Sequence, residues 1–221
     1  MKRLLTLVLG LSIIGHISAQ EDLKTPKDPK AKVILDKLSA NTKSFSTITA
    51  DFEFRLLNKA EGIDDKQNGQ IILKDDKYKL ILSQQEIISN GTTVWTYLKD
   101  VKEVQISEVD EDDEDAVFLN PKKIFTIYET GFKYVLAEDA VKNGKNVNVI
   151  KLYPEEPGDK PYHTILLYID KAKTEISGME IKSKDGNVFI YTINSFVTNK
   201  TYPGSAFEFK TPAGVEEIDL R

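Results

Sequence analysis

The sequence predicts a mainly β protein built on one strongly curved antiparallel sheet. We expect about eleven strands that form an open or closed barrel, with a helical lid over the concave face. Two observations predict this fold. Segments that alternate apolar and polar residues follow one another from residue 46 to residue 198, with connections too short for parallel neighbours. Only two segments have helical spacing, so few helices are available to cover the apolar face of the sheet.

The first 19 residues have the layout of a secretory signal peptide. Two basic residues precede an apolar run from Leu4 to Ile14, and Ile17-Ser18-Ala19 precedes a charged segment. We expect cleavage after Ala19. The apolar run is about half of the roughly 20 residues that span a bilayer, so export is expected rather than insertion. No linker divides residues 20–221, which are predicted to form a single domain.

The composition excludes several classes of function. The formal net charge is −5, and it becomes more negative when Lys2 and Arg3 leave with the signal peptide. An acidic surface without a basic stripe repels nucleic acid, so no nucleic-acid partner is expected. The chain has no cysteine. Disulfides, thiol chemistry and lipid attachment through an N-terminal cysteine are therefore excluded.

The first helix is predicted to begin at residue 29. Asp28 is placed to cap it, and Pro29 suits the first helical position. Apolar residues then recur at i, i+3, i+4 and i+7, namely Ala31, Ile34, Leu35 and Leu38. This stripe predicts an amphipathic helix that ends near Lys43 and packs on an apolar surface.

A series of strands is predicted next. Residues 46–57 alternate with a period of two, and their apolar side carries Ile48, Ala50, Phe52, Phe54 and Leu56. Further strands are predicted at residues 69–74, 78–83, 86–89, 92–98 and 101–108. Short polar turns separate them, including Asp75-Asp76 and Asn90-Gly91.

A second helix is predicted from Asn120-Pro121 to Gly131. Its apolar side carries Ile124, Phe125 and Tyr128. Strands then resume at residues 132–137, 145–153, 162–170, 175–183 and 187–198, and a last short strand is predicted at 207–210.

Few side chains could carry out catalysis. His163 is the one histidine after the leader, so Cys-His and zinc ligand sets cannot be built, and no G-x-S-x-G turn supports a Ser-His-Asp triad. We expect His163 to be an ordinary strand residue. The acidic run from Asp110 to Asp115 lacks the glycine and the spacing of an EF-hand loop, which favours a solvated acidic loop over a calcium site. The sequence therefore predicts no catalytic residue, no metal and no cofactor.

Large apolar residues recur along the predicted strands and on the second predicted helix. Each one taken alone is expected to be core. Taken together they could line a ligand cavity, because a curved sheet under helices often encloses one. The candidate lining residues are Phe52, Phe54, Ile72, Tyr78, Leu80, Trp95, Tyr97, Ile124, Phe125 and Tyr128.

Five segments in order resemble the outer-membrane lipoprotein carrier family, LolA. They are SFSTITADFEF, GQIILKDDKYKL, IISNGTTVWTY, NPKKIFTIY and FEFKTPAGVEEIDLR. The resemblance implies a half-barrel with a helical lid, and it places Trp95 and Tyr97 on the apolar concave surface or its rim. One departure concerns the lid. Many relatives carry Lys-Arg-Pro where this chain has Lys74-Asp75-Asp76, so the arginine that reaches the lid helices is absent here.

The resemblance also implies a function. It is that of a monomeric periplasmic chaperone that shields the acyl chains of lipoproteins and carries them from the inner to the outer membrane. The implied partners are acylated lipoproteins, an inner-membrane lipoprotein-releasing transporter, and an outer-membrane acceptor or the membrane itself. Two alternatives stay open: a regulatory module that senses lipid or lipoprotein on the same scaffold, and an enzyme acting on lipid, which would need convergent polar groups on the concave face.

Overall fold

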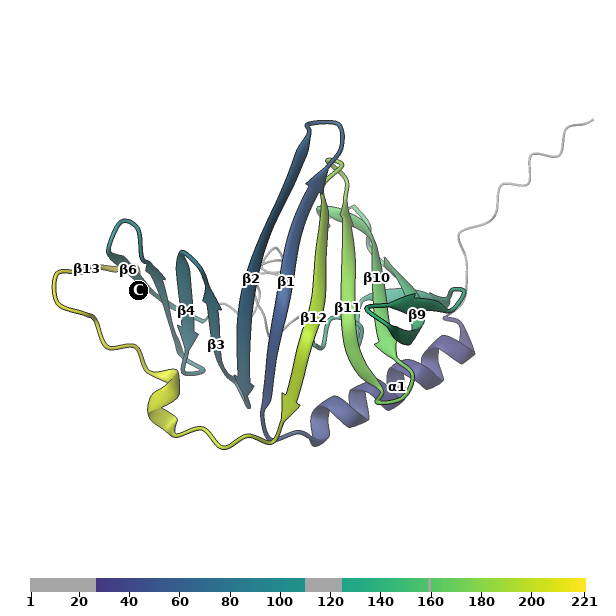
Figure 1. Ribbon diagram of the computed structural model, residues 1–221, viewed down its shortest axis with the longest axis horizontal. Helices are drawn as coiled ribbons and strands as arrows, with labels where there is room; N and C mark the ends of the chain where they lie inside the picture. Colours follow the sequence, from purple (N-terminus) through teal and green to yellow (C-terminus); the bar gives the residue numbers. More distant parts are fainter. Residues whose placement is uncertain (1–26, 110–124, 159) are drawn as a thin grey trace, which may run out of the picture.

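The computed structural model describes residues 27–109, 125–158 and 160–221. The predicted signal peptide, the acidic run 110–115 and residues 120–124 of the second predicted helix lie outside this part of the chain. The described residues form one α-helix, thirteen strands and a short 3-10 helix (Figure 1). These are α1 (Pro29–Ser44), β1 (Ile48–Asn58), β2 (Ile63–Lys74), β3 (Lys77–Leu82), β4 (Gln85–Ser89), β5 (Thr93–Leu98), β6 (Glu103–Glu108), β7 (Phe132–Leu136), β8 (Ala140–Lys142), β9 (Lys145–Pro154), β10 (Tyr162–Asp170), β11 (Glu175–Ser183), β12 (Val188–Thr198), η2 (Gly204–Phe207) and β13 (Glu216–Asp219).

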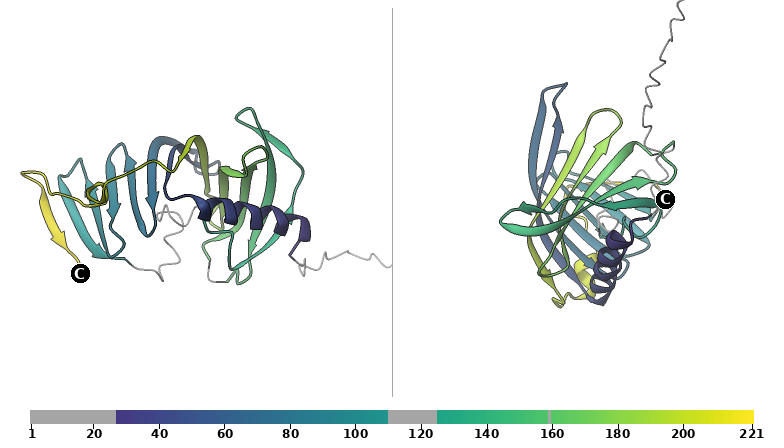
Figure 2. Two further views of the ribbon diagram at one scale, coloured as in Figure 1. Left: turned by 90° about the horizontal axis from the view of Figure 1, so that it is seen from below. Right: turned by 90° about the vertical axis from the view of Figure 1, so that its right-hand side faces the viewer.

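All the strands belong to one open sheet. Its order is β13-β6-β5-β4-β3-β2-β1-β12-β11-β10-β9-β7, and β8 pairs with β9. The pairing of β1 with β12 joins the two halves of the chain at the middle of the sheet. The sheet curves around α1 (Figure 2), which confirms the predicted half-barrel.

The strands differ from the prediction at the C-terminus. The last strand is not at residues 207–210, because Phe207 ends η2 and the chain continues without strand pairing. The final strand is instead β13, which pairs in parallel with β6 at the edge of the sheet. Its sequence, Glu-Glu-Ile-Asp, is short and acidic, and this composition gives no strand signal.

The first helix matches the prediction. The Asp28 carboxylate accepts hydrogen bonds from the backbone N–H groups of Lys30, at 2.8 Å, and Ala31. Buried Ala31, Leu35 and Leu38 form its apolar stripe. Asp28 also accepts a hydrogen bond from the backbone of Leu136 at 3.0 Å, and its own N–H donates to the Tyr134 carbonyl. The cap therefore attaches the start of α1 to β7.

The second predicted helix is not found in its described half. Residues 125–128 form a turn, and the Glu129 N–H donates to the Thr126 carbonyl three residues earlier. Gly131 has a positive φ of 78°, which ends this turn directly before β7. Within the described residues, α1 alone forms the α-helical lid.

Strand register assigns each side chain to one of two faces. The inner face packs against α1, and one of its ladders crosses the sheet through Ala50, Ile71, Leu80, Ile87 and Thr96. The adjacent ladder lies on the outer face and runs through Thr49, Ile72, Lys79, Ile88, Trp95 and Ile106. Successive residues of each strand therefore lie on opposite faces of the sheet.

Residues 199–215, which we call the C-terminal strap, lie on the outer face (Figure 2). The Tyr202 and Thr49 hydroxyls are 2.8 Å apart, and the Lys74 ammonium donates to the Tyr202 carbonyl at 3.2 Å. Phe207 is fully buried, and the ring of Phe209 lies 5.5 Å from that of Tyr97. The strap gives this half of the sheet a second apolar layer.

Candidate functional site

A row of aromatic rings runs along the middle of the inner face. Phe52 and Phe54 come from β1, and Phe189 and Tyr191 come from β12. The Tyr191 ring lies 6.2 Å from Phe52 and 5.1 Å from Phe54, and Phe54 stacks on Phe189 at 6.2 Å. Phe52 and Tyr191 are buried, whereas Phe54 and Phe189 are half-buried. The row therefore leads from buried rings to half-buried rings.

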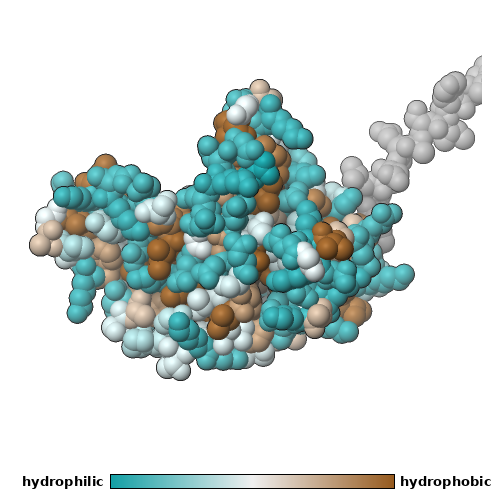
Figure 3. Space-filling model, viewed as in Figure 1, coloured by the Kyte–Doolittle hydropathy of each residue, from teal (hydrophilic) through white to brown (hydrophobic). Residues whose placement is uncertain are grey.

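A second aromatic group closes the other end of β1 and β12. The Phe196 ring of β12 lies 6.2 Å from Phe45, which follows α1, and 6.0 Å from Phe125. Phe125 is almost fully buried. Among the described residues, α1 and these rings close the inner face at one end, and half-buried Phe54 and Phe189 lie at the other. Apolar side chains are visible at the surface of the projecting hairpins (Figure 3).

Buried phenols lie along the same face. Burial raises the pKa of Tyr78 and of Tyr191. Burial also raises the pKa of Tyr128 to about 12, although the nearby Thr42 side chain acts in the opposite direction. The Tyr128 hydroxyl makes no well-formed hydrogen bond. These phenols stay protonated at neutral pH, so the centre of the face is uncharged and suited to alkyl chains.

Polar side chains hold α1 over the β7–β11 side of this face. The Ser39 hydroxyl donates to the Glu129 carboxylate at 2.5 Å, and the Lys43 ammonium lies 2.9 Å from the same carboxylate. The Asn41 amide donates to the Thr174 carbonyl at 3.0 Å. Together with Asp28, these groups hold the lid in place.

The Glu129 carboxylate should make the attachment of the lid sensitive to acid. Burial alone would raise its pKa, but the hydrogen bond from Ser39 and the Lys43 ammonium outweigh burial and lower the pKa below the usual 4.5. The ionised carboxylate therefore stabilises the fold above pH 4.5, and this contribution is lost as pH falls through the lowered pKa. Glu129→Gln should reduce the free energy of unfolding by roughly 0.5–1 kcal/mol at pH 7. The difference from wild type should shrink below pH 4.5 in urea titrations.

The matched control is Glu156→Gln, which changes an exposed carboxylate in a loop. At each pH, Glu156→Gln should have the same urea midpoint as wild type. If the difference in the free energy of unfolding between Glu129→Gln and wild type stays constant from pH 7 to pH 3, the role assigned to the ionised carboxylate is contradicted.

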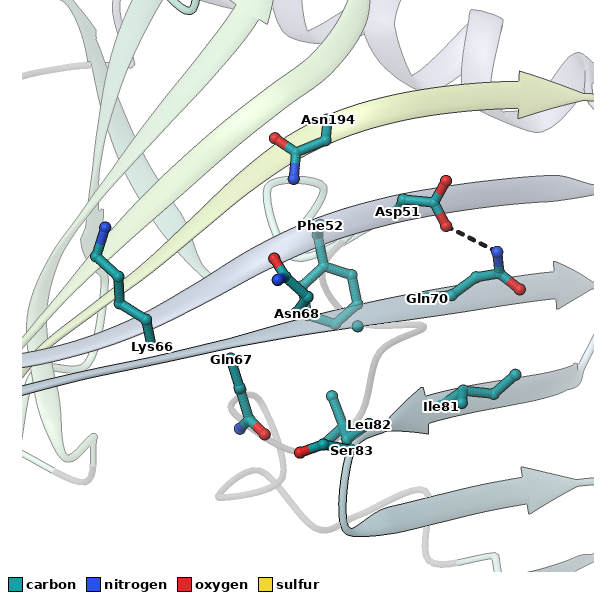
Figure 4. Close-up of a pocket in the computed structure, with 11 residues that line it drawn as sticks. Asp51, Phe52, Lys66, Gln67, Asn68, Gln70, Ile81, Leu82, Ser83 and Asn194 are labelled. Atoms are coloured by element: carbon teal, nitrogen blue, oxygen red, sulfur yellow. Dashed lines mark hydrogen bonds between the residues drawn. The ribbon is translucent and has the colours of Figure 1, made fainter.

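A groove opens beside the aromatic row, where β3 ends and β2 continues (Figure 4). Its volume is about 830 Å³. Phe52 and Leu82 contribute apolar surface from the inner face. The remaining side chains of the lining are mostly polar: Asp51, Lys66, Gln67, Asn68, Gln70, Ile81, Ser83 and Asn194. We call this space the β2 groove.

Gly69 of β2 makes room for the Phe52 ring. A β-carbon on Gly69 would lie 2.5 Å from Cζ of Phe52 and 2.8 Å from Cδ2 of Leu82. Gly69→Ala should therefore force the ring aside and lower the free energy of unfolding by about 1–3 kcal/mol, measured by urea denaturation. Gly158→Ala is the control, because nothing lies within 4 Å of the added carbon. Equal stability of the two variants would contradict this packing.

The structure divides the predicted cavity residues between the two faces. Phe52, Phe54, Tyr78 and Leu80 lie on the inner face, and Phe125 and Tyr128 pack into the same cluster. Ile124 lies outside the described residues. Ile72, Trp95 and Tyr97 lie on the outer face, so their prediction as concave-face residues is corrected by the register. The physical reason is that β5 and the Ile71–Leu73 part of β2 carry apolar residues on both faces, so the sequence pattern does not identify the side that faces inward.

Four aromatic residues of the site were not predicted: Phe189, Tyr191, Phe196 and Phe45. The alternation of Phe189, Tyr191 and Ile193 within the strand predicted at 187–198 was the signal for the first two. A bulge displaces Phe196 from that alternation. Phe52 pairs with Ile193 while Asp51 pairs with Ser195, which leaves Asn194 as the extra residue.

Other candidate sites have little support in the described residues. His163 is exposed, and its ring contacts the adjacent Thr164 hydroxyl at 2.9 Å. Within the described ranges, no group of three or more histidine, aspartate or glutamate side chains is arranged to hold a metal ion. No helix in the same ranges is long and apolar enough to span a membrane.

Comparison with known proteins agrees with this geometry. Residues 43–210 match the family model described as outer membrane lipoprotein carrier protein LolA. The chain belongs to the LolA family. An outer-membrane lipoprotein carrier protein of Francisella tularensis is 25% identical over 199 residues, covering 84% of this chain and 86% of the relative. One from Ralstonia nicotianae is 25% identical over 136 residues, or 61% and 59% of the two chains.

Two solved structures share the LolA fold of this chain at low sequence identity. An uncharacterized conserved protein from Thermus thermophilus is 12% identical, with a TM-score of 0.57, and the match covers 86% of this chain and 99% of that one. The lipoprotein LppX of Mycobacterium tuberculosis is 13% identical, with a TM-score of 0.50 and coverage of 80% and 98%. These matches concern the fold alone.

Proposed function

We propose that this protein is a periplasmic carrier that binds the acyl chains of lipoproteins on the inner face of its sheet. The observation that carries the proposal is the aromatic row, which leads from half-buried Phe54 to Phe52 in the core cluster that α1 shares. Membership of the LolA family and the names of its curated relatives support lipoproteins as the cargo. The function requires no catalytic step.

The physical task of such a carrier is to shield alkyl surface from water. A 16-carbon chain in water represents roughly 12 kcal/mol of unfavourable hydration, at about 0.8 kcal/mol for each CH₂ group. Rings and aliphatic side chains can cover this surface without fixing one geometry, because the hydrophobic effect is non-directional. The carrier can then release the chains to a membrane or an acceptor.

The transfer route completes the proposal. A monomer would receive acylated lipoproteins from an inner-membrane lipoprotein-releasing transporter and deliver them to an outer-membrane acceptor or to the membrane itself. Movement of α1 would adjust the exposed apolar area, and it would require the polar attachments at Asp28, Glu129 and Thr174 to open.

Native mass spectrometry tests the proposed cargo. The protein is mixed with a triacylated lipoprotein and, separately, with the same lipoprotein lacking its acyl groups. A one-to-one complex with the acylated form alone is expected. Binding to neither form, or to both equally, would overturn acyl-chain binding and favour an interaction module on the same scaffold.

A further inference from the structure

Part of β2 has an open edge. All of β2 except its last residue pairs with β1, but β3 pairs only with residues 69–74. Residues 63–68 therefore have no strand neighbour on the β3 side within the described chain. Six residues of extended backbone present about 20 Å of unpaired N–H and C=O groups. This open edge borders the β2 groove, whose lining includes Lys66, Gln67 and Asn68.

Two of the three charged side chains at this edge, Asp64 and Lys66, have partners within the sheet. Arg55 donates to Asp64 at 2.6 Å, and the Lys66 ammonium lies 3.3 Å from Glu53. The Asp51 carboxylate lines the groove, and hydrogen bonds from Ser195 and Gln70 stabilise its charge and lower its pKa.

Neutral groups make up much of the remaining polar lining. Gln67, Asn68, Asn194 and Ser83 each present uncharged donors and acceptors to the groove (Figure 4). Peptide groups have the same combination of donor and acceptor. These neutral groups of the groove can therefore pair with a polypeptide backbone.

We propose that the open edge of β2 binds the extended polypeptide segment that follows the acylated residue of the lipoprotein cargo, adding it to the sheet as a strand. This inference rests on the proposed carrier function. The occupant is inferred because the aromatic row and the β2 groove are continuous. Phe52 belongs both to the aromatic row and to the groove lining, so a molecule with alkyl chains on the inner face would have its peptide beside residues 63–68. Main-chain hydrogen bonds would then add affinity that does not depend on the amino-acid sequence of the cargo.

Binding of synthetic lipopeptides tests the backbone pairing. The probe carries a diacylglyceryl group on its first cysteine, followed by ten residues, and two further versions are N-methylated at alternate positions in opposite frames. Alternate N–H groups of a strand face the same edge. One N-methylated frame should therefore bind about tenfold more weakly than the parent, and the other should bind within about twofold.

Disulfide trapping tests the location. The chain has no cysteine, so Asn68→Cys provides a single thiol at the groove. Lipopeptides with one free cysteine at successive positions should cross-link with a period of two along the peptide. The matched control is Glu216→Cys on the exposed edge strand β13, which should cross-link at background level.

The outcomes separate this inference from the carrier function. Tight binding of all three lipopeptides, with no periodic cross-linking, would overturn the strand-addition site and leave acyl binding intact. Failure of every lipopeptide to bind would overturn both. Disulfide-linked dimers of Asn68→Cys in place of peptide adducts would assign the edge to a second copy of the chain and overturn the cargo assignment.

Discussion

Phe54→Asp is expected to weaken the binding of a diacylated lipopeptide by at least about 100-fold. The ring lies between Tyr191 and Phe189 at the half-buried end of the aromatic row. Removing it forfeits about 1.5–3 kcal/mol of apolar burial, and covering a carboxylate with an alkyl chain adds a desolvation cost. A total of about 2.7 kcal/mol corresponds to 100-fold in affinity. Because Phe54 is half-buried, the empty protein should remain folded.

Val197→Asp is the matched control for this experiment. It places the same acidic group on the neighbouring strand β12, but Val197 pairs with Thr49 on the outer face and is 50% exposed. Isothermal titration with the lipopeptide should give wild-type affinity for the control. If Phe54→Asp also stays within about threefold of wild type while circular dichroism shows a folded protein, the acyl chains do not lie along the aromatic row.

Elements with local signals were predictable from the sequence. The Asp28-Pro29 pair located the start of α1, because a side-chain cap and a first-turn proline act within a few residues. Strand β1 was predicted because its outer side is polar, with Thr49, Asp51 and Glu53. These residues specify both the element and the face that it buries, so Phe52 and Phe54 were placed correctly on the inner face.

Features that depend on distant segments could not be predicted. Strand β5 reads Thr-Val-Trp-Thr-Tyr-Leu, with apolar residues on both sides, because the C-terminal strap covers its outer face more than a hundred residues later in the chain. The hydrophobic pattern therefore could not identify the inward side of Trp95. Likewise, β13 exists because β6 offers it an edge, and its own residues carry no strand signal.

Phe207→Ala is expected to lower the free energy of unfolding by about 3–4 kcal/mol. Phe207 is fully buried, and its ring lies 6.4 Å from Tyr202 within the strap. Removing a buried phenylalanine costs its transfer free energy and leaves a cavity. Urea denaturation followed by circular dichroism measures the change. Leu220→Ala is the control, because Leu220 is 62% exposed and its truncation should alter stability by less than about 0.5 kcal/mol.

The fluorescence of Trp95 can distinguish changes on the outer face of the sheet from changes on the inner face. It is the one tryptophan of the chain and lies on the outer face beside Ile88 and Ile106. Loosening of the strap in Phe207→Ala should expose the indole to water and shift its emission to longer wavelength. Lipopeptide binding to wild type should leave the emission unchanged, because the acyl chains occupy the other face. An emission shift on lipid binding as large as that caused by Phe207→Ala would mean that ligand reaches the outer face or displaces the strap, and would contradict the separation of the two surfaces.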